Sequence, residues 1–189
     1  MHADNWANKA KQMGYRSRAV FKLEEILQKF GSKRRYQNVL DLGSSPGGWS
    51  QYIIKKYNSS MVFAIDILEM EPIDGVNFYQ ENIECIDSIP EIKKLKGSFN
   101  LVISDIAPNL TGINAIDIEN IYQLNCLTLD TAVEYLEKSC GSFIMKTFQN
   151  SMLKNLRKKM ELSFKIVQTF KPAASKKQSG EIYLYGAYK

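Results

Sequence analysis

The sequence predicts an α/β fold in which a mostly parallel sheet is covered by helices on both faces. Short apolar runs of strand length alternate with helical patterns along most of the chain, which is typical of parallel strands joined by crossover helices. A glycine-rich turn at residues 43–48 separates one such run from a helical pattern, as in sheets that bind ligands at their carboxyl edge. The last two runs have no helical pattern between them, so we expect that pair to be antiparallel.

The expected helices and strands follow from the spacing of apolar residues. Helices are predicted over residues 18–30, 48–57, 117–138 and 151–162. Strands are predicted over residues 37–42, 61–66, 76–79, 99–106, 141–148, 163–170 and 181–188. Ser17 is a candidate N-cap for the first helix, and Gly31 is its expected stop. Helical patterns after Asn82 are weak, and residues 171–180 have the small, polar composition of a mobile loop.

The 189 residues are expected to form a single domain, 1–189, that is large enough for a core. Residues 1–17 form a basic segment ahead of the first helix. No apolar run has the length of a membrane span, and none has the character of a secretory signal. The three cysteines are widely spaced and odd in number, which argues against a disulfide framework and against zinc. We therefore expect an intracellular protein in a reducing compartment.

The surplus of positive charge, +5 for the whole chain, is concentrated in three clusters. The first lies within the first 35 residues and comprises Lys9, Lys11, Arg16, Arg18, Lys22, Lys29, Lys33, Arg34 and Arg35. The second comprises Lys154, Arg157, Lys158, Lys159 and Lys165, and the third Lys171, Lys176 and Lys177. A single charge run usually marks a solvated face. Three clusters on a small domain favour a polyanionic partner such as nucleic acid.

The glycine-rich turn does not match either common phosphate-binding loop. Gly43 and Gly48 are spaced as in a P-loop, but Trp49 stands where that loop needs a lysine. Ser45 interrupts the glycine pattern of a dinucleotide-binding loop. The turn therefore suits a flat, weakly charged nucleoside, with Trp49 either as an apolar wall of the site or as a core residue.

Charged residues stand at the ends of several predicted strands and beside the first helix. Asp66 ends the second strand, 23 residues after the first glycine of the turn, where an acid either holds ribose hydroxyls or caps a turn. Asp105 closes a very apolar strand at the expected ligand edge. Lys146 lies inside a strand, where a lysine must extend its amine to the surface or serve a site. Lys22 lies beside the apolar stripe of its helix and would ordinarily be a surface lysine.

Five segments, in order along the chain, carry a resemblance to a known family. They are Y-R-S-R-A-V-F-K-L at 15–23, D-L-G-S-S-P-G-G-W-S-Q at 41–51, S-D-I-A-P-N at 104–109, F-I-M-K-T-F-Q at 143–149 and S-G-E-I-Y-L at 179–184. With them the chain resembles the RrmJ/FtsJ-type, or heat-shock, ribosomal RNA ribose 2′-O-methyltransferases. The resemblance covers about Gly14 to Gly186, and five ordered segments make it specific.

The resemblance implies a Rossmann-like seven-stranded S-adenosylmethionine-dependent methyltransferase fold with its last strand antiparallel. It implies S-adenosyl-L-methionine as cofactor, S-adenosyl-L-homocysteine as product, and no metal. The implied catalytic tetrad is Lys22, Asp105, Lys146 and Glu181. With the glycines of the turn, the expected cofactor-binding residues are Gly43, Gly47, Gly48, Trp49, Asp66, Asn82 and Asp105. The family usually has an aspartate where this chain has Asn82, whose amide can still accept and donate hydrogen bonds.

The implied reaction moves a methyl group from a sulfonium to a ribose 2′-hydroxyl, with a uridine of large-subunit ribosomal RNA as the expected target. Lys146 is the implied general base and must be neutral when the hydroxyl attacks; alternatively, the site works mainly by orienting the hydroxyl. The 2′-hydroxyl selects RNA over DNA. The basic N-terminal segment and helix 151–162 match the family's RNA-facing side. We expect a monomer located in the cytoplasm, or in a mitochondrion or other organelle, rather than in the nucleus.

Several other functions are compatible with the same fold. A transfer RNA or messenger RNA cap ribose methyltransferase differs only in its substrate. A catalytically idle RNA-binding scaffold is disfavoured because all four tetrad residues are present. A small-molecule or protein methyltransferase is disfavoured by the paired lysines and the basic clusters. An NAD-dependent oxidoreductase is disfavoured most, because the dinucleotide-binding glycine pattern is absent.

Overall fold

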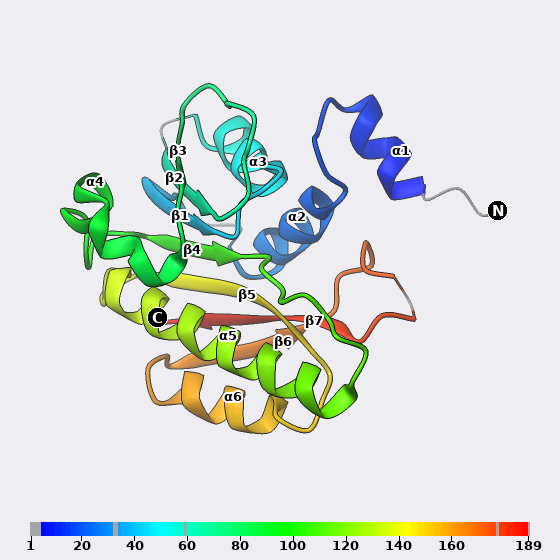
Figure 1. Cartoon of the computed structure of the whole chain (residues 1–189). Helices are drawn as coiled ribbons and strands as arrows, with labels where there is room; N and C mark the ends of the chain where they lie inside the picture. Colours follow the sequence, from blue (N-terminus) through cyan, green and yellow to red (C-terminus); the bar gives the residue numbers. More distant parts are fainter. Residues whose placement is uncertain (1–4, 32–33, 59, 177, 189) are drawn as a thin grey trace.

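Seven strands form one sheet in the computed structural model, which describes residues 5–31, 34–58, 60–176 and 178–188 (Figure 1). They are β1 (Asn38–Leu42), β2 (Met61–Asp66), β3 (Val76–Gln80), β4 (Leu101–Ser104), β5 (Ser142–Phe148), β6 (Ile166–Phe170) and β7 (Glu181–Ala187). The strand order is β3-β2-β1-β4-β5-β7-β6. β1 to β5 pair in parallel, whereas β7 runs antiparallel to both β5 and β6. The predicted fold class and the antiparallel last strand are confirmed.

The sheet reverses its strand order at β1. This strand pairs with β2 on one side and with β4 on the other, so the chain builds the sheet outward in two directions. Such a switch point opens a crevice outside the carboxyl ends of the strands. The ends of β1 and β4 therefore mark where a ligand is expected.

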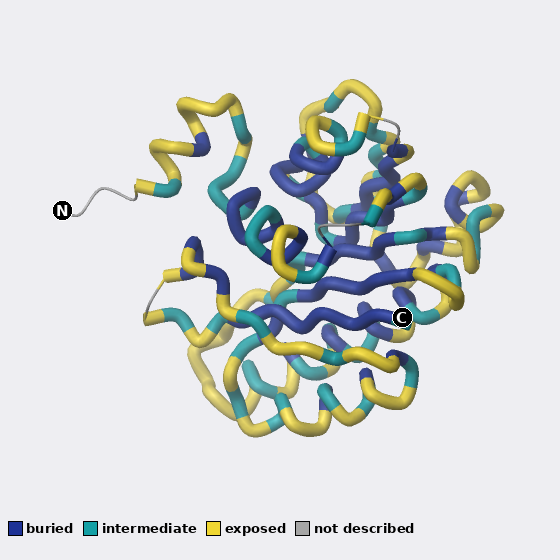
Figure 2. The backbone as a smooth tube through the Cα atoms, turned by 180° about the vertical axis from the view of Figure 1, so that it is seen from behind, coloured by how far each residue is buried: buried dark blue, intermediate teal, exposed yellow. Residues whose placement is uncertain are grey.

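Helices cover both faces of the sheet (Figure 1). They are α1 (Asn5–Gln12), α2 (Ala19–Phe30), α3 (Gly48–Lys56), the 3-10 helix η1 (Ile83–Ser88), α4 (Pro90–Lys93), α5 (Asn114–Tyr135) and α6 (Leu153–Glu161). α2 and α3 enclose one core with the sheet, and η1, α4, α5 and α6 enclose the other. Figure 2 shows that the buried residues run along the central strands between these layers.

Residues along the central strands alternate between the two cores, because successive side chains of a strand point to opposite faces. In β5, Phe143 belongs to the core beneath α5 and α6, and Ile144 to the core beneath α2 and α3. Two residues further, Lys146 lies on the α2 face. In β7, Tyr183 belongs to the α2 core, which puts Glu181 on that face as well. Because side chains alternate with a period of two residues along each strand, Lys146 and Glu181 both lie on the face covered by α2.

The largest differences from the prediction concern α1, β4, η1 and α4. The N-terminal segment contains α1, which was not predicted because its sequence is mostly polar; only Ala10 of its residues is buried. The strand predicted over 99–106 is shortened to β4, because the chain leaves the sheet after Ser104 and Asp105 lines the crevice. The weak helical patterns after Asn82 become η1 and α4.

The ends of α2 partly match their predicted caps. Arg18, not Ser17, occupies the N-cap position, although the Ser17 hydroxyl accepts a hydrogen bond from the Ala19 N–H at 3.1 Å. Gly31 is the C-cap, and its N–H donates to the carbonyl of Leu27 at 2.8 Å. The stop was therefore predicted correctly.

Residues 171–180 contain no helix or strand among those that the structure describes. The carboxylate of Glu25 on α2 accepts hydrogen bonds from the N–H groups of Ala173, at 2.7 Å, and Ala174, at 3.0 Å. Ala174 and Ser175 are buried. Part of this segment is therefore held against α2, and its mobility stays a prediction.

Candidate active site

Lys22 is buried on α2 and forms an ion pair with Glu181 at the start of β7. Its side chain is only 8% exposed, and that of Glu181 is 14% exposed. Lys22 Nζ lies 2.7 Å from Oε1 and 2.9 Å from Oε2 of the carboxylate. Lys22 is therefore not a surface lysine, because burial of an ammonium requires a charged partner of this kind.

A second ion pair lies beside it at the carboxyl ends of β4 and β5. Lys146 Nζ is 3.2 Å from Oδ1 of Asp105 and also donates to the backbone carbonyl of Asp105. The side chain of Lys146 is 12% exposed and that of Asp105 is 23% exposed. The lysine inside the strand does not simply extend to the surface; its amine is held at the crevice.

Tyr183 on β7 connects the two ion pairs. It is the register partner of Lys146, and its hydroxyl donates to Asp105 Oδ1 at 2.8 Å. Lys22 Nζ lies 5.8 Å from the centre of its ring. Tyr183 was not among the residues predicted from the sequence, although its position two residues after Glu181 indicates the same face of the strand.

The protonation of this cluster follows from its burial and its charges. Burial raises the pKa of the Glu181 carboxyl, but the hydrogen bond and charge of Lys22 outweigh that effect, so the pKa lies below its ordinary value. The Ser175 hydroxyl adds a hydrogen bond of 2.8 Å to Glu181. Burial, and then the charges of Asp105 and Glu181, hold the pKa of Tyr183 well above its ordinary value. Tyr183 therefore stays a phenol that donates to Asp105.

A cavity of about 530 Å³ opens next to Asp105, outside the carboxyl ends of β1, β2 and β4. Its volume is in the range of small-molecule sites. Its polar lining includes Asp66, Glu81, Asn82, Glu84, Asp105 and Asn109, and its apolar lining includes Ile65, Ile67, Leu68, Ile83, Ile106, Pro108, Leu124 and Leu127. Apolar walls together with several carboxylates match a flat nucleoside that carries ribose hydroxyls.

Gly43 and Asp66 shape the floor of this cavity. Gly43 has φ +73°, and a Cβ there would lie 2.8 Å from Cβ of Ile106, so only glycine fits. The two carboxylate oxygens of Asp66 accept the N–H groups of Ser45, at 2.8 Å, and Leu68, at 2.9 Å. Each oxygen can accept a second hydrogen bond, so Asp66 caps the turn and still has capacity for a ligand.

The remaining expected cofactor residues lie in different settings. Asn82 lines the cavity, but its side-chain oxygen accepts from the Glu84 N–H at 3.0 Å and caps η1. Trp49 is 3% exposed, packs against Tyr183 and donates from its indole to the Ala19 carbonyl at 2.8 Å. It is a core residue that, with Gly48, also lines a smaller cavity. Gly47 lines neither cavity.

The smaller cavity borders a buried acid, Asp41, that was not predicted from the sequence as a site residue. It measures about 50 Å³ and lies between the glycine-rich turn, Asp41 and Asp105. Asp41 is 1% exposed and accepts the hydroxyl of Ser50 at 2.7 Å. Burial raises the pKa of its carboxyl to about 7, the Ser50 hydrogen bond opposes that rise, and the charge of Asp105 adds to it. The signal was available, because Asp41 opens the D-L-G segment.

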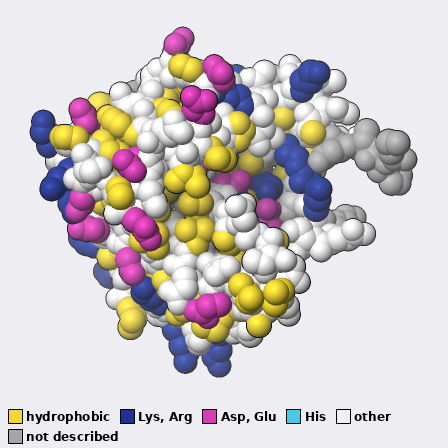
Figure 3. Space-filling view, viewed as in Figure 1, with side chains coloured by type: hydrophobic (Ala, Val, Ile, Leu, Met, Phe, Trp, Pro, Cys, Tyr) yellow, Lys and Arg dark blue, Asp and Glu magenta, His cyan; other side chains and the backbone are white. Residues whose placement is uncertain are grey.

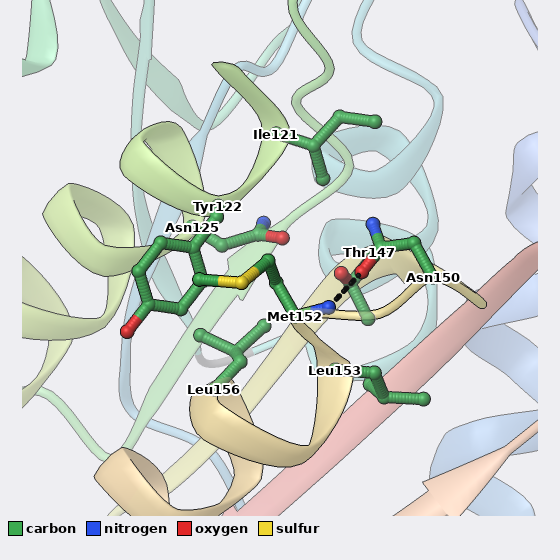
Figure 4. Close-up of a pocket in the computed structure, with 8 residues that line it drawn as sticks. All are labelled: Ile121, Tyr122, Asn125, Thr147, Asn150, Met152, Leu153 and Leu156. Carbon is green, nitrogen blue, oxygen red and sulfur yellow. Dashed lines mark hydrogen bonds between the residues drawn. The ribbon is translucent and has the colours of Figure 1, made fainter. Parts of the chain in front are cut away.

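On the opposite face of β5, α5 and α6 enclose a small, mostly apolar recess with no room for a water molecule (Figure 4). Its residues are Ile121, Tyr122, Asn125, Thr147, Asn150, Met152, Leu153 and Leu156. The Asn125 amide donates to the backbone carbonyl of Lys146 at 2.9 Å. The β4 pairing of β5 ends at Met145, so this side chain supplies a hydrogen bond where the neighbouring strand has left. The Asn125 hydrogen bond therefore holds the backbone of Lys146 from the face of the sheet opposite the ion pairs.

Cations of the first two basic clusters lie on opposite faces of the sheet, and Lys33 and Lys177 lie outside the residues that the structure describes. α6 packs on the face opposite the ion pairs, and two of its cations are engaged within the chain. Lys159 Nζ lies 2.7 Å from Asp130 Oδ2, and Arg157 Nη2 lies 3.3 Å from Glu161 Oε1. The cluster on α1 and α2 lies on the face of the ion pairs. Figure 3 shows a hollow beside this N-terminal part, with acidic and basic side chains at its floor.

No helix of the described part of the chain is long and apolar enough to cross a membrane. No three of the histidine, cysteine, aspartate and glutamate side chains that the structure describes gather so that they could hold a metal ion.

The strand order, the antiparallel β7 and the cavity at the switch point define an α/β protein of the methyltransferase class. The family model described as FtsJ-like methyltransferase matches residues 15–189. The chain therefore belongs to the FtsJ-like methyltransferase family.

Similar proteins cover almost the whole chain. A protein named ribosomal RNA large subunit methyltransferase E from Wigglesworthia glossinidia brevipalpis is 41% identical over 184 residues, which cover 97% of this chain and 90% of that protein. A protein of the same name from Ehrlichia chaffeensis is 41% identical over 191 residues, which cover 97% and 87%. A crystal structure described as a ribosomal RNA methyltransferase from Plasmodium falciparum has a TM-score of 0.76 and 28% identity, with 92% of this chain and 97% of that one covered.

Proposed function

We propose that this protein methylates the 2′-hydroxyl of a ribose in large-subunit ribosomal RNA, with S-adenosyl-L-methionine as methyl donor. The observation that carries the proposal is the convergence of Lys22–Glu181 and Lys146–Asp105, linked by Tyr183, beside the nucleoside-sized cavity. Two largely buried lysine–carboxylate pairs suit a reaction on a hydroxyl group of a polyanion. The names of the relatives support ribosomal RNA as the polyanion.

The larger cavity suits the proposed cofactor. Asp66 has free acceptor capacity for ribose hydroxyls, and the apolar walls around Ile67, Leu68 and Ile83 suit an adenine ring. Asn82 lies on the same wall and would offer its amide N–H to the base. When bound, S-adenosylmethionine would supply an electrophilic methyl group. Gly47, Gly48 and Trp49 then support the turn rather than contact the adenosine.

The chain's own residues would prepare the nucleophile. Lys146 would accept the proton of the 2′-hydroxyl as that oxygen attacks, and must first have lost its own ammonium proton. The bound sulfonium would supply the methyl group and leave as a neutral thioether. Asp105 holds Lys146 Nζ in place before the transfer and stabilises the ammonium that results. Tyr183 fixes the orientation of Asp105. Lys22, held by Glu181, is a fixed positive charge that positions the ribose-phosphate backbone.

The proposal extends to the organisation of the protein. Residues 1–189 act as a single methyltransferase domain and monomer, with RNA bound along the face of α1 and α2. A separate RNA-binding module is not needed when the substrate is a preassembled ribosomal particle. The protein then works in the compartment that holds this particle.

Methyl transfer from labelled S-adenosylmethionine into ribosomal particles that lack ribose methylation tests this function. The wild type should label one 2′-O position of the large-subunit RNA. Lys146→Ala should lose at least about 100-fold in turnover and still bind cofactor and RNA, because it removes a group used in the transition state. Lys146→Arg should fail almost as badly, since arginine does not release its proton. Near-full activity of Lys146→Arg would refute the general-base role. If the wild type did not label the RNA, the alternative of a catalytically idle RNA-binding scaffold would be favoured instead.

A further inference from the structure

Arg16 lies in the basic N-terminal segment, yet its guanidinium points back onto the protein. Nη1 donates to the carbonyl oxygens of Pro46, at 3.2 Å, and Glu71, at 2.5 Å. Nη2 donates to the carbonyl of Pro72 at 2.7 Å. Three of its five N–H donors thus bind loop carbonyls from two separate segments. The planar guanidinium donates here from two separate nitrogens, a geometry that the single nitrogen of a lysine ammonium does not reproduce.

The two segments that Arg16 joins are the glycine-rich turn and residues 69–73. The hydroxyl of Ser45 donates to the Glu69 carbonyl at 3.1 Å, which ties them a second time. Gly47 has φ +100°, and a Cβ there would lie 2.6 Å from Ile73 Cδ1. Gly47 therefore allows residues 69–73 to pack directly on the turn. Asp66 is connected to the same turn, because its carboxylate accepts the Ser45 N–H.

The backbone around Arg16 is also fixed to α3. Gln51 on α3 accepts the N–H of Arg16 with its side-chain oxygen, at 3.1 Å. The same amide donates to the Gly14 carbonyl at 2.8 Å. The connection between α1 and α2 consequently lies beside α3 (Figure 1). α2 begins three residues after Arg16 and carries Lys22 on its first turn, so the same contacts also set where Lys22 enters the site.

We propose that Arg16 is a positioning residue, which holds the glycine-rich turn and residues 69–73 in the shape that binds the cofactor, rather than a contact to RNA phosphates. The inference rests on the proposed function, because it assigns the cofactor to the cavity bordered by Gly43 and Asp66. It separates one arginine of the first basic cluster from the charges available to RNA. The residue acts through the loops that it joins and touches no reacting atom.

Isothermal titration with S-adenosyl-L-homocysteine measures the cofactor site without RNA. Arg16→Ala should raise the dissociation constant by about five- to tenfold, since three hydrogen bonds that hold the loops are lost. Arg16→Lys should recover little of the loss. Gln51→Ala, which is neutral, should weaken binding in the same direction. Lys56→Ala removes one exposed positive charge from the far end of α3 and should bind like the wild type.

Methyl-transfer kinetics then separate positioning from simple destabilisation. The KM for the cofactor should rise by about five- to tenfold in Arg16→Ala, and saturating cofactor should restore kcat to within about twofold of the wild type. The dissociation constant for RNA should change by less than about twofold. Unchanged binding of S-adenosyl-L-homocysteine together with weakened RNA binding would overturn the inference, because Arg16 would then be a phosphate contact. A kcat that saturating cofactor does not restore would also overturn it. If the wild type itself did not bind S-adenosyl-L-homocysteine, the proposed function would be refuted together with this inference.

Discussion

The buried acid beneath the glycine-rich turn makes the stability of this protein depend on pH. Asp41 is 1% exposed, and burial raises the pKa of its carboxyl from 3.8 to about 7. Folded molecules therefore hold a proton at pH values at which the unfolded chain has released it. The free energy of unfolding falls as the pH rises from about 4 to about 7, because the unfolded state binds fewer protons there. Asp41→Asn removes this titration and keeps an acceptor for Ser50.

The size of the effect follows from the pKa difference. About three pKa units correspond to roughly 4 kcal/mol at high pH. Part of that difference is already present at pH 5, which lies above the unfolded value. Relative to the wild type, Asp41→Asn should therefore gain about 2–3 kcal/mol in the free energy of unfolding between about pH 5 and about pH 8.

Urea unfolding followed by circular dichroism at both pH values measures this gain. Asp87→Asn is a suitable control, because Asp87 is an exposed acid whose pKa is lowered by its hydrogen bond to Lys96. That variant should not gain stability as the pH rises. An equal effect of Asp41→Asn at both pH values, or a loss at the higher one, would refute the reasoning that an uncharged carboxyl is buried there.

Three further predictions concern the ion pair, the cofactor and the RNA. Lys22→Met should lower the free energy of unfolding by about 2–3 kcal/mol, because it leaves the Glu181 carboxylate buried without a counter-charge; adding Glu181→Gln should recover most of the loss in urea unfolding. Asp66→Ala should weaken S-adenosyl-L-homocysteine binding by about 1–3 kcal/mol in calorimetry, and unchanged affinity would exclude it from the ribose site. RNA binding should weaken steeply as salt rises, and Lys11→Glu on α1 should weaken it and leave cofactor binding intact; a flat salt dependence would mean that the basic clusters are only solvated faces.

Much of the architecture was accessible from the sequence, because hydrophobic periodicity reports local structure directly. β2 lies at the predicted residues 61–66, and the antiparallel pairing of the last two strands followed from the missing crossover helix. The element boundaries that were predicted wrongly are those set by tertiary contacts. β4 ends early because the chain turns into the crevice at Asp105. α1 has too little buried surface for its pattern to stand out.

The candidate site was accessible only in part. The resemblance implied Lys22, Asp105, Lys146 and Glu181 together, but no spacing along the chain showed which lysine pairs with which acid. The structure pairs Lys22 with Glu181 and Lys146 with Asp105. It also adds Tyr183, whose role depends on the register between β5 and β7.

The sequence by itself determined the class of fold, the position of the glycine-rich turn and the residue types at the carboxyl edge. These depend on periods of two and 3.6 and on glycine geometry, which are properties of short segments. Only the tertiary structure decided that Lys22 is buried, that Asp41 carries a raised pKa and that the exposed Arg16 binds loop carbonyls. Burial and pairing arise when segments far apart in the sequence meet, and the free energy of a charge depends on those neighbours rather than on its place in the chain.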